Sequence, residues 1–174
     1  QLGQQIIESL GGKRIHPAWV VPGGVNEPLS SDLRDKILAK LPEGMNIIKR
    51  TLDWFKRGLD GYQEEIRTFA NFPSLFMGMI NPNKELAHYD GTLRFVDASG
   101  RIVADKVNLD KYMDYIAEAV EPWSYLKFPY FKPYGYPDGM YRVGPLARLN
   151  VIESCGTKLA DQEWAEFRAL GRGA

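Results

Sequence analysis

The chain has 174 residues, with 22 basic and 22 acidic side chains, two histidines and one cysteine. The single cysteine excludes an intrachain disulfide framework and any metal site built on several cysteines of this chain. The zero net charge argues against general nucleic-acid binding, because phosphate recognition needs an excess of Lys and Arg. A hydrophobic content of 44% indicates a globular chain, and no apolar run reaches the 18 or so residues that span a membrane.

Residues 4–10 have the pattern of a helix end, which the two glycines at 11 and 12 would terminate. A Gly- and Pro-rich stretch follows, and the short apolar run at 18–21 predicts a strand between turns. Ser30 or Ser31 is expected to cap a helix that runs to Leu41. Pro42 is expected to break or kink that helix.

A second helix is predicted after Pro42, because apolar residues recur there at alternating spacings of three and four. They form one stripe over about seven turns: Met45, Ile48, Leu52, Phe55, Leu59, Tyr62, Ile66 and Phe69. Gly58 and Gly61 are weak points of this helix. The stripe is interpreted as a packing seam rather than as a cofactor-binding face.

Residues 74–80 predict a buried strand or a short apolar segment. Two β-prone runs, 92–96 and 101–104, flank a Gly-containing loop and predict a β-hairpin. A helix is predicted over 109–120, with Asn108 as its N-cap. A last helix is predicted over 161–170.

Residues 122–144 are the compositional outlier, with clustered aromatic side chains and four prolines that exclude a regular helix or a central strand. Two interpretations stay open. The rings could be exposed and bind sugars, bases or proline-rich peptides, or they could be buried in a larger core or a subunit interface. Helices at both ends around a hairpin, without β-α-β alternation, indicate an α+β fold with long antiparallel-packed helices and a small sheet.

The sequence lacks the usual phosphate-binding, dinucleotide-binding, zinc-protease and serine-hydrolase motifs. His16 is read either as a turn anchor bonded to a carbonyl or as a polar relay near a redox or metal centre. Glu118 would lie opposite the apolar face of its predicted helix, either solvated or paired with Lys127. A buried Arg142 or Arg148 would need a carboxylate or carbonyl partner.

Two long strings carry a family resemblance. Residues 11–17 (GGKRIHP), followed by 21–25 (VPGGV), resemble a stretch of nickel–iron hydrogenase large subunits, and residues 141–150 (YRVGPLARLN) resemble another. The aromatic run 123–132 is similar to the part of that family just before the second string. The version here is most similar to the NAD-reducing, bidirectional, cytoplasmic branch.

In that family two C-x-x-C pairs hold the nickel–iron centre, one near each end of the large subunit. Neither is present here, and Cys155 has no cysteine three residues away. The resemblance therefore implies an internal section of a larger subunit, with 1–29, 30–70, 71–107 and 108–174 as its consecutive parts. It also implies that this section binds no metal and contains no catalytic residue.

What the resemblance implies for single residues is limited. His16 matches a His-Pro that lies towards the nearest iron–sulfur cluster of the small subunit, at the electron-transfer interface. Glu118 and Lys127 resemble positions in an outer shell around a magnesium ion or water network. Arg142 and Arg148 are expected to be structural.

The full assembly implied by the resemblance oxidises hydrogen and reduces NAD+ reversibly at a nickel–iron centre in the cytoplasm. Magnesium belongs to that assembly, and iron–sulfur clusters, FMN and NAD belong to its partner subunits. The expected partners are the hydrogenase small subunit, the diaphorase subunits and the rest of the large subunit, without nucleic acid or a membrane span. The alternatives are a non-catalytic α+β module that binds ligands through its aromatic–proline surface, or a quinone-reducing subunit of respiratory NADH dehydrogenase.

Overall fold

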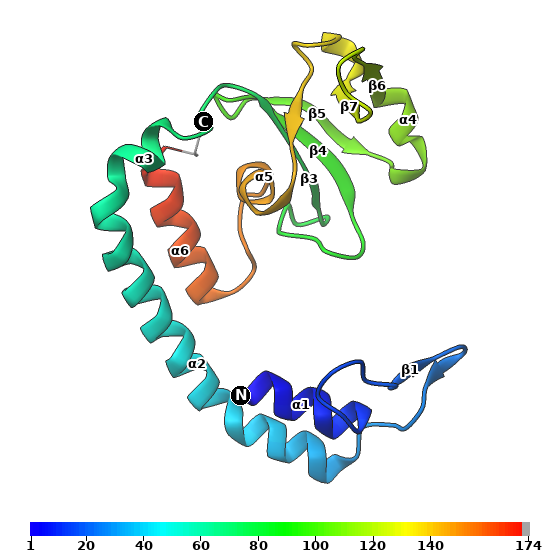
Figure 1. The fold of residues 1–174 in the computed structure, drawn as a ribbon, viewed down its shortest axis with the longest axis vertical. Coiled ribbons are helices and arrows are strands. Elements are labelled where there is room, and N and C mark those ends of the chain that lie inside the picture. The colour runs from blue at the N-terminus through cyan, green and yellow to red at the C-terminus, as the bar shows by residue number, and fades with distance from the viewer. Residues whose placement is uncertain (172–174) are drawn as a thin grey trace. The chain divides into compact units, whose positions relative to one another are not determined.

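Helices dominate residues 1–64, and a four-stranded sheet dominates the rest of the chain (Figure 1). The computed structural model describes residues 1–171. It divides into two units, Gln1–Glu64 and Glu65–Ala174, and each is described by itself.

The first unit opens with helix α1, Leu2–Gly11, as residues 4–10 predict. Gly12 ends it in the left-handed conformation, with φ 72°, and its N–H donates to the Glu8 carbonyl. The predicted short strand is also present. It is β1, Val20–Val21, paired antiparallel with β2, Gly24–Val25.

Helix α2 runs without interruption from Ser31 to Leu59, and Ser30 caps it by accepting a hydrogen bond from the Leu33 N–H at 3.2 Å. Pro42 lies inside this helix and does not break it, so the two helices predicted on either side of it are one. Proline removes a single backbone hydrogen bond and crowds the preceding turn, which bends a helix that has good helix formers on both sides. The α2 ribbon changes direction along its length (Figure 1).

The predicted apolar stripe continues beyond α2 into two short elements, the 3₁₀ helix η1, Asp60–Tyr62, and helix α3, Gln63–Thr68. Two glycines, Gly58 and Gly61, lie at this change of helix type, where they favour departure from regular α geometry.

The second unit is built on one sheet with the strand order β5-β4-β3-β8. Its strands are β3, Leu75–Ile80; β4, Thr92–Val96; β5, Ile102–Val107; and β8, Tyr141–Arg142. The hairpin predicted from residues 92–104 is β4 and β5, which pair antiparallel, and the buried strand predicted at 74–80 is β3. The strand β8 pairs parallel with the start of β3.

One face of this sheet is covered by α5, Gly144–Val151, whose apolar side chains pack on alternate residues of β3 (Figure 1). The buried cluster there is Phe76, Ile80, Val96, Ala147, Val151 and Ile152. Gly78 allows the close approach, since a Cβ on it would lie 2.6 Å from a Val151 methyl carbon and 3.5 Å from the Arg148 Cα. The predicted closing helix is confirmed as α6, Lys158–Ala169. The indole N–H of Trp164 on this helix donates a hydrogen bond to the Leu149 carbonyl of α5.

Against the other face packs the base of a hairpin formed by β6, Ile116–Val120, and β7, Lys127–Phe131, through Ile116 and Phe131. Before it come η2, Leu109–Lys111, and the single turn α4, Tyr112–Tyr115. The helix predicted over 109–120 was therefore wrong beyond its first turns. Pairing with the β-prone strand β7, together with packing of Ile116 in the cluster of Leu75, Phe95 and Phe131, overrides the helical spacing.

The aromatic–proline segment has both buried and exposed rings. Phe131 is 2% exposed and packs on Phe95 at a centroid distance of 4.6 Å, whereas Trp123 and Tyr125 are 73% and 96% exposed. Pro129 lies in β7, a strand of a two-stranded ribbon rather than of a central sheet. The short 3₁₀ helix η3, Lys132–Tyr134, then leads towards β8.

The combination of helices with a mainly antiparallel sheet confirms the α+β prediction. Within residues 1–171, none of the helices combines the length and apolarity needed to cross a bilayer.

Candidate functional site

The predicted pair Glu118 and Lys127 lies on the β6–β7 hairpin, and the structure brings the two charges together. The Lys127 Nζ is 3.3 Å from a carboxylate oxygen of Glu118, and both side chains are more than half exposed. The pairing register aligns Glu118 with Pro129 and Val120 with Lys127, so the contact is diagonal across the ribbon. An exposed pair of this kind contributes little to stability but orients its carboxylate.

The position of Glu118 differs from the prediction because the segment is a strand. Alternate residues of a strand share a face, so Glu118 is on the same face as Ile116 and Val120 rather than opposite them. That face borders a cleft of about 550 Å³. Its lining residues are Tyr112, Met113, Ile116, Ala117, Glu118, Pro129, Lys132 and Tyr141.

Tyr141 and Lys132 provide two of the hydrogen-bonding groups of this cleft. Burial raises the pKa of the Tyr141 phenol, and the negative charge of Glu118 raises it further, so this hydroxyl stays protonated and able to donate. Lys132 donates to the Met113 carbonyl and thereby ties η3 to α4. The cleft is therefore lined by one carboxylate, two phenols and one ammonium group that can contact a bound molecule or water.

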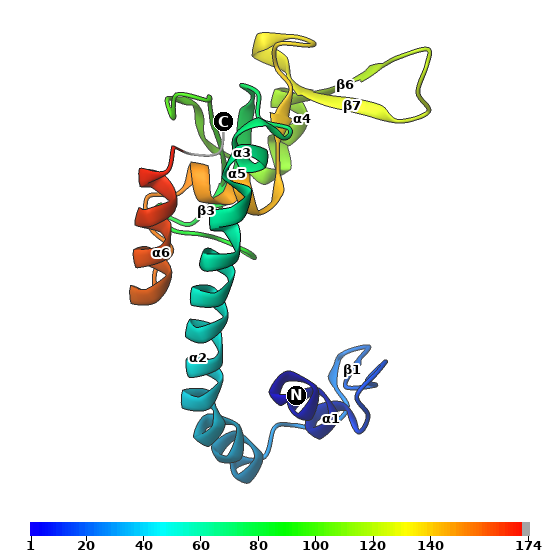
Figure 2. The same ribbon diagram turned by 60° about the vertical axis from the view of Figure 1, so that its left-hand side comes forward.

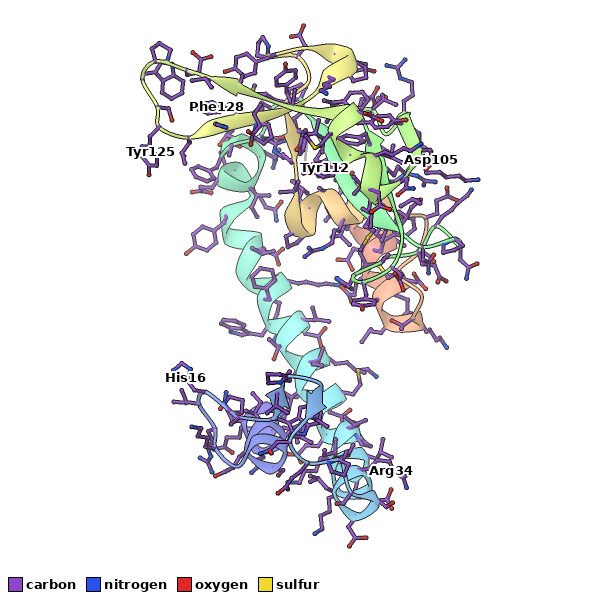
Figure 3. All side chains as sticks on the ribbon, turned by 90° about the vertical axis from the view of Figure 1, so that its right-hand side faces the viewer. His16, Arg34, Asp105, Tyr112, Tyr125 and Phe128 are labelled. Carbon is purple, nitrogen blue, oxygen red and sulfur yellow. The ribbon has the colours of Figure 1, made fainter. Side chains whose placement is uncertain are left out.

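His16 is in the loop after α1 and belongs to the first unit, whereas the cleft residues belong to the second unit. It is exposed, has a positive φ of 51°, and points away from α1 (Figure 3). Its ring makes no hydrogen bond to any residue in 1–171, so the carbonyl contact of the turn-anchor interpretation is not made there.

The two predicted structural arginines lie around the start of α5. Arg142, on β8, donates to the carbonyls of Ala70 and Phe72 at 2.7 and 2.9 Å, which are carbonyl partners of the predicted kind. Arg148 lies half-buried on α5, and its backbone is at the close approach to Gly78.

Sequence reasoning missed the most buried charge of the chain. Arg94, on β4, is 2% exposed and holds Asp105 of β5 through two parallel hydrogen bonds of 2.9 and 3.0 Å. The same guanidinium donates to the Val151 carbonyl and to Glu153, which also pairs with Lys84. An Arg within an apolar strand and an Asp in the other arm of its hairpin were the available signal.

Metal-ligating side chains are dispersed. Within residues 1–171, no three or more His, Cys, Asp or Glu side chains gather as a group that could hold a metal ion. Cys155 is half-buried, and burial together with the charge of Asp161 raises the pKa of its thiol, which disfavours the thiolate that binds metals.

Comparison with known proteins supplies what the cleft geometry alone does not. No family model matches the chain. It is 38% identical over 169 residues to a vhu subunit of the F420-non-reducing hydrogenase of Methanocaldococcus jannaschii, covering 96% of this chain and 40% of the relative. It is also 38% identical over 178 residues to the NAD-reducing hydrogenase HoxS subunit beta of Cupriavidus necator, covering 98% and 36%.

A solved structure agrees with these relatives. A chain in the crystal structure of an NAD+-reducing [NiFe]-hydrogenase in the H2-reduced state superposes with a TM-score of 0.82 and 37% identity, covering 96% of this chain and 37% of that one. The chain is similar to hydrogenase subunits. It spans about two fifths of the length of the curated relatives it matches.

These relatives correct one prediction. The two strings predict the large, catalytic subunit of a nickel–iron hydrogenase, but the relatives are named as a vhu subunit and as HoxS subunit beta, and neither name is that of a large or catalytic subunit. We therefore withdraw the assignment to the large subunit. What stands is similarity to subunits of multi-subunit hydrogenases, one of them NAD-reducing.

Proposed function

We propose that this chain is part of a hydrogenase subunit whose assembly oxidises hydrogen and passes the electrons reversibly to NAD+. The observation that carries the proposal is the agreement in fold with a chain of an NAD+-reducing hydrogenase, at a TM-score of 0.82 over 96% of this chain. The 38% identity to the NAD-reducing HoxS subunit beta supports the same acceptor. A cytoplasmic location is part of the proposal, because NAD+ is a cytoplasmic acceptor.

The role proposed for these residues is that of a scaffold and a partner surface. The nickel–iron centre named for the similar structure does not fit them, because Cys155 is the single cysteine and the described ligand-type side chains do not gather into a group. Iron–sulfur clusters, FMN and NAD are assigned by this proposal to other subunits, among them those of the small-subunit and diaphorase type.

His16 is proposed to lie at the contact with an iron–sulfur partner subunit. Its exposed ring and left-handed backbone support a role at the surface of the first unit, where the imidazole can donate a hydrogen bond to a partner. In the assembled enzyme, His16→Ala should slow hydrogen-dependent NAD+ reduction more than it slows hydrogen–deuterium exchange. Equal loss of both activities would refute the interface role.

Glu118 and Lys127 are proposed to order water around a magnesium ion that other parts of the assembly ligate. Glu118 supplies the single carboxylate among the lining residues of its cleft, which is too few for a complete magnesium shell but sufficient for an outer contact. The Lys127 ammonium lies 3.3 Å from the Glu118 carboxylate, whose ionised form is the one that an outer contact with magnesium-bound water needs.

The decisive experiment is genetic and biochemical. The gene is deleted in its host, and hydrogen-dependent reduction of NAD+ and of the dye benzyl viologen is measured in extracts. We expect both activities to be lost, and to return when the gene is restored. Return of dye reduction without NAD+ reduction would refute NAD+ as acceptor, and unchanged activity in the deletion strain would refute the hydrogenase role.

A second candidate function rests on the exposed rings at the tip of the β6–β7 hairpin. Trp123 and Tyr125 are largely exposed there, and the hairpin projects from the rest of the second unit (Figures 2 and 3). Such a surface suits a non-catalytic module that binds a peptide or sugar. Loss of binding to a glycan or proline-rich peptide array on Tyr125→Ala, with hydrogenase activity intact in the deletion strain, would favour this function over the first.

A further inference from the structure

The segment that joins α3 to β3 lacks regular secondary structure, yet its backbone is held at several points. Residues 69–74 follow the last turn of α3, and Ala70 adopts a positive φ of 52°, which is unfavourable for a residue with a Cβ. Such a conformation persists when neighbouring groups fix it. The neighbouring group here is the side chain of Arg142.

One guanidinium contacts three successive parts of this segment. Arg142 Nη2 donates to the Ala70 carbonyl at 2.7 Å, and Nη1 donates to the Phe72 carbonyl at 2.9 Å and to the Ser74 Oγ at 3.1 Å. The guanidinium carbon Cζ of Arg142 also lies 4.2 Å from the centre of the Phe72 ring. The planar fork of an arginine can satisfy separate acceptors in this way, whereas a lysine is a point charge.

The other end of Arg142 is anchored in the core. The strand β8 pairs with the start of β3, and the Leu75 N–H donates to the Met140 carbonyl at 3.2 Å. Next to Arg142, the Tyr141 ring packs edge-on against the buried Phe95 at 5.7 Å. The other hydrogen bonds of the segment run to near neighbours in the sequence, among them those from Asn71 Nδ2 to the Arg67 carbonyl at 3.0 Å and from Ser74 Oγ to the Leu75 carbonyl at 3.1 Å. The Arg142 guanidinium therefore supplies the long-range link between this segment and a fixed strand.

We propose that Arg142 is a latch that fastens the 69–74 segment to the sheet and thereby fixes how the chain enters β3. With the latch closed, Ala70 is held in its left-handed conformation between α3 and β3. With the latch open, residues 69–74 become a free linker while the sheet keeps its core. The device is conformational, and it is independent of the reaction that the assembly performs.

The test is limited proteolysis of the full chain by chymotrypsin. Chymotrypsin can cleave the Phe69–Ala70 bond, which lies at the start of the 69–74 segment held by Arg142. The Tyr62–Gln63 bond lies outside that segment and serves as an internal reference. For Arg142→Gln, we expect the ratio of the Phe69–Ala70 to the Tyr62–Gln63 cleavage rate to rise at least about tenfold, since three hydrogen bonds to a charged group are lost. Thermal unfolding of the sheet, followed in parallel, should stay cooperative.

Two comparisons make the result specific. Arg142→Lys should behave like Arg142→Gln, because an ammonium group cannot reach the three acceptors together. The control Arg101→Gln removes an exposed arginine that pairs with Asp97 in the turn between β4 and β5, and its cleavage ratio should equal that of the native protein. A rise with Arg101→Gln as large as with Arg142→Gln would indicate general weakening of the sheet and overturn the latch.

Milder variants keep the test decisive if Arg142→Gln does not fold. Ser74→Ala removes one hydrogen bond and Phe72→Leu removes the ring, and each should raise the cleavage ratio about two- to threefold. A native ratio in both of these variants, or in a folded Arg142→Gln, overturns the proposal.

Discussion

The two units of the chain carry similar amphipathic patterns but bury them differently. In Gln1–Glu64 no described residue is buried, and the apolar stripe of α2 is partly to largely exposed, with Ile48 and Phe55 more than half exposed. In the second unit the same kind of residues close into two clusters on either face of one sheet. An apolar stripe in a sequence thus predicts that a face will be covered, but not whether the covering residues belong to the same chain.

This contrast also separates two roles within the proposed assembly. The sheet unit contains the core that can hold the cleft around Glu118 in a fixed shape. The helical unit has its apolar side chains available to other polypeptide, since no residue of it is buried in the described structure. Truncation of an apolar side chain should therefore lower the free energy of unfolding strongly in the sheet unit and only slightly in the helical unit.

The largest contrast is expected for phenylalanine truncation. Phe76 is fully buried under α5, so Phe76→Ala should lower the free energy of unfolding by about 3–5 kcal/mol, through lost burial and a cavity. Phe55→Ala, at a ring 54% exposed, should change it by less than about 0.5 kcal/mol in the isolated chain. Urea unfolding followed by circular dichroism measures both, and equal effects would mean that α2 is covered in solution.

A smaller but distinctive effect is expected at Arg94. Arg94→Met keeps the apolar stem and removes the charge, so Asp105 and Glu153 lose their shared partner. The side chains of Asp105 and Glu153 are one-third and one-half exposed, so water can hydrate them once Arg94 is removed. We therefore expect the free energy of unfolding to fall by about 2–3 kcal/mol, which is below the range for a fully buried ion pair.

The pH dependence of that loss identifies its cause. The hydrogen bond from Arg94 holds the pKa of Asp105 below its usual value, and the pKa of Glu153 is lowered first by Lys84 and then by Arg94. A carboxyl group whose pKa is lower in the folded than in the unfolded protein stabilises the fold at a pH above its unfolded pKa. This stabilisation disappears as the pH falls through the folded-state pKa. The native protein should therefore lose stability below about pH 4, and Arg94→Met should lose less over the same interval. Parallel pH profiles for the two proteins would rule out the ion pairs as the cause.

The sequence-based predictions succeeded where one local signal dominated. The hairpin predicted from 92–96 and 101–104 around a glycine-containing loop, the capping serine at 30 and the glycine end of α1 all follow from short-range chemistry. They failed where pairing at a distance decided the outcome. Residues 116–120 have a usable helical spacing, but β7 offers a ladder of hydrogen bonds and Phe131 a place for Ile116 to pack.

The candidate site was predicted only in part for the same reason. Glu118 and Lys127 could be named from strings of residues, but their 3.3 Å contact depends on the ribbon register, which no local pattern gives. The acceptors of Arg142 are carbonyls some 70 residues earlier in the chain, and backbone carbonyls leave no residue-type signal. Long-range hydrogen bonds to backbone are therefore the part of a site that a single sequence conceals most completely.

The smallest changes in the free energy of unfolding are expected from two glycine-to-alanine substitutions, and they should have opposite signs in the two units. Gly58 is near the end of α2, and nothing lies within 4 Å of the place that a Cβ on it would occupy, so Gly58→Ala should raise helix content and stabilise the chain by up to about 1 kcal/mol. Gly78 is in β3, where an added Cβ would lie 2.6 Å from Val151, so Gly78→Ala should cost about 1–3 kcal/mol by pushing α5 from the sheet. Thermal unfolding by circular dichroism distinguishes the two. Stabilisation by both variants would show that α5 moves aside freely, and destabilisation by Gly58→Ala would show that another surface already covers that side of α2.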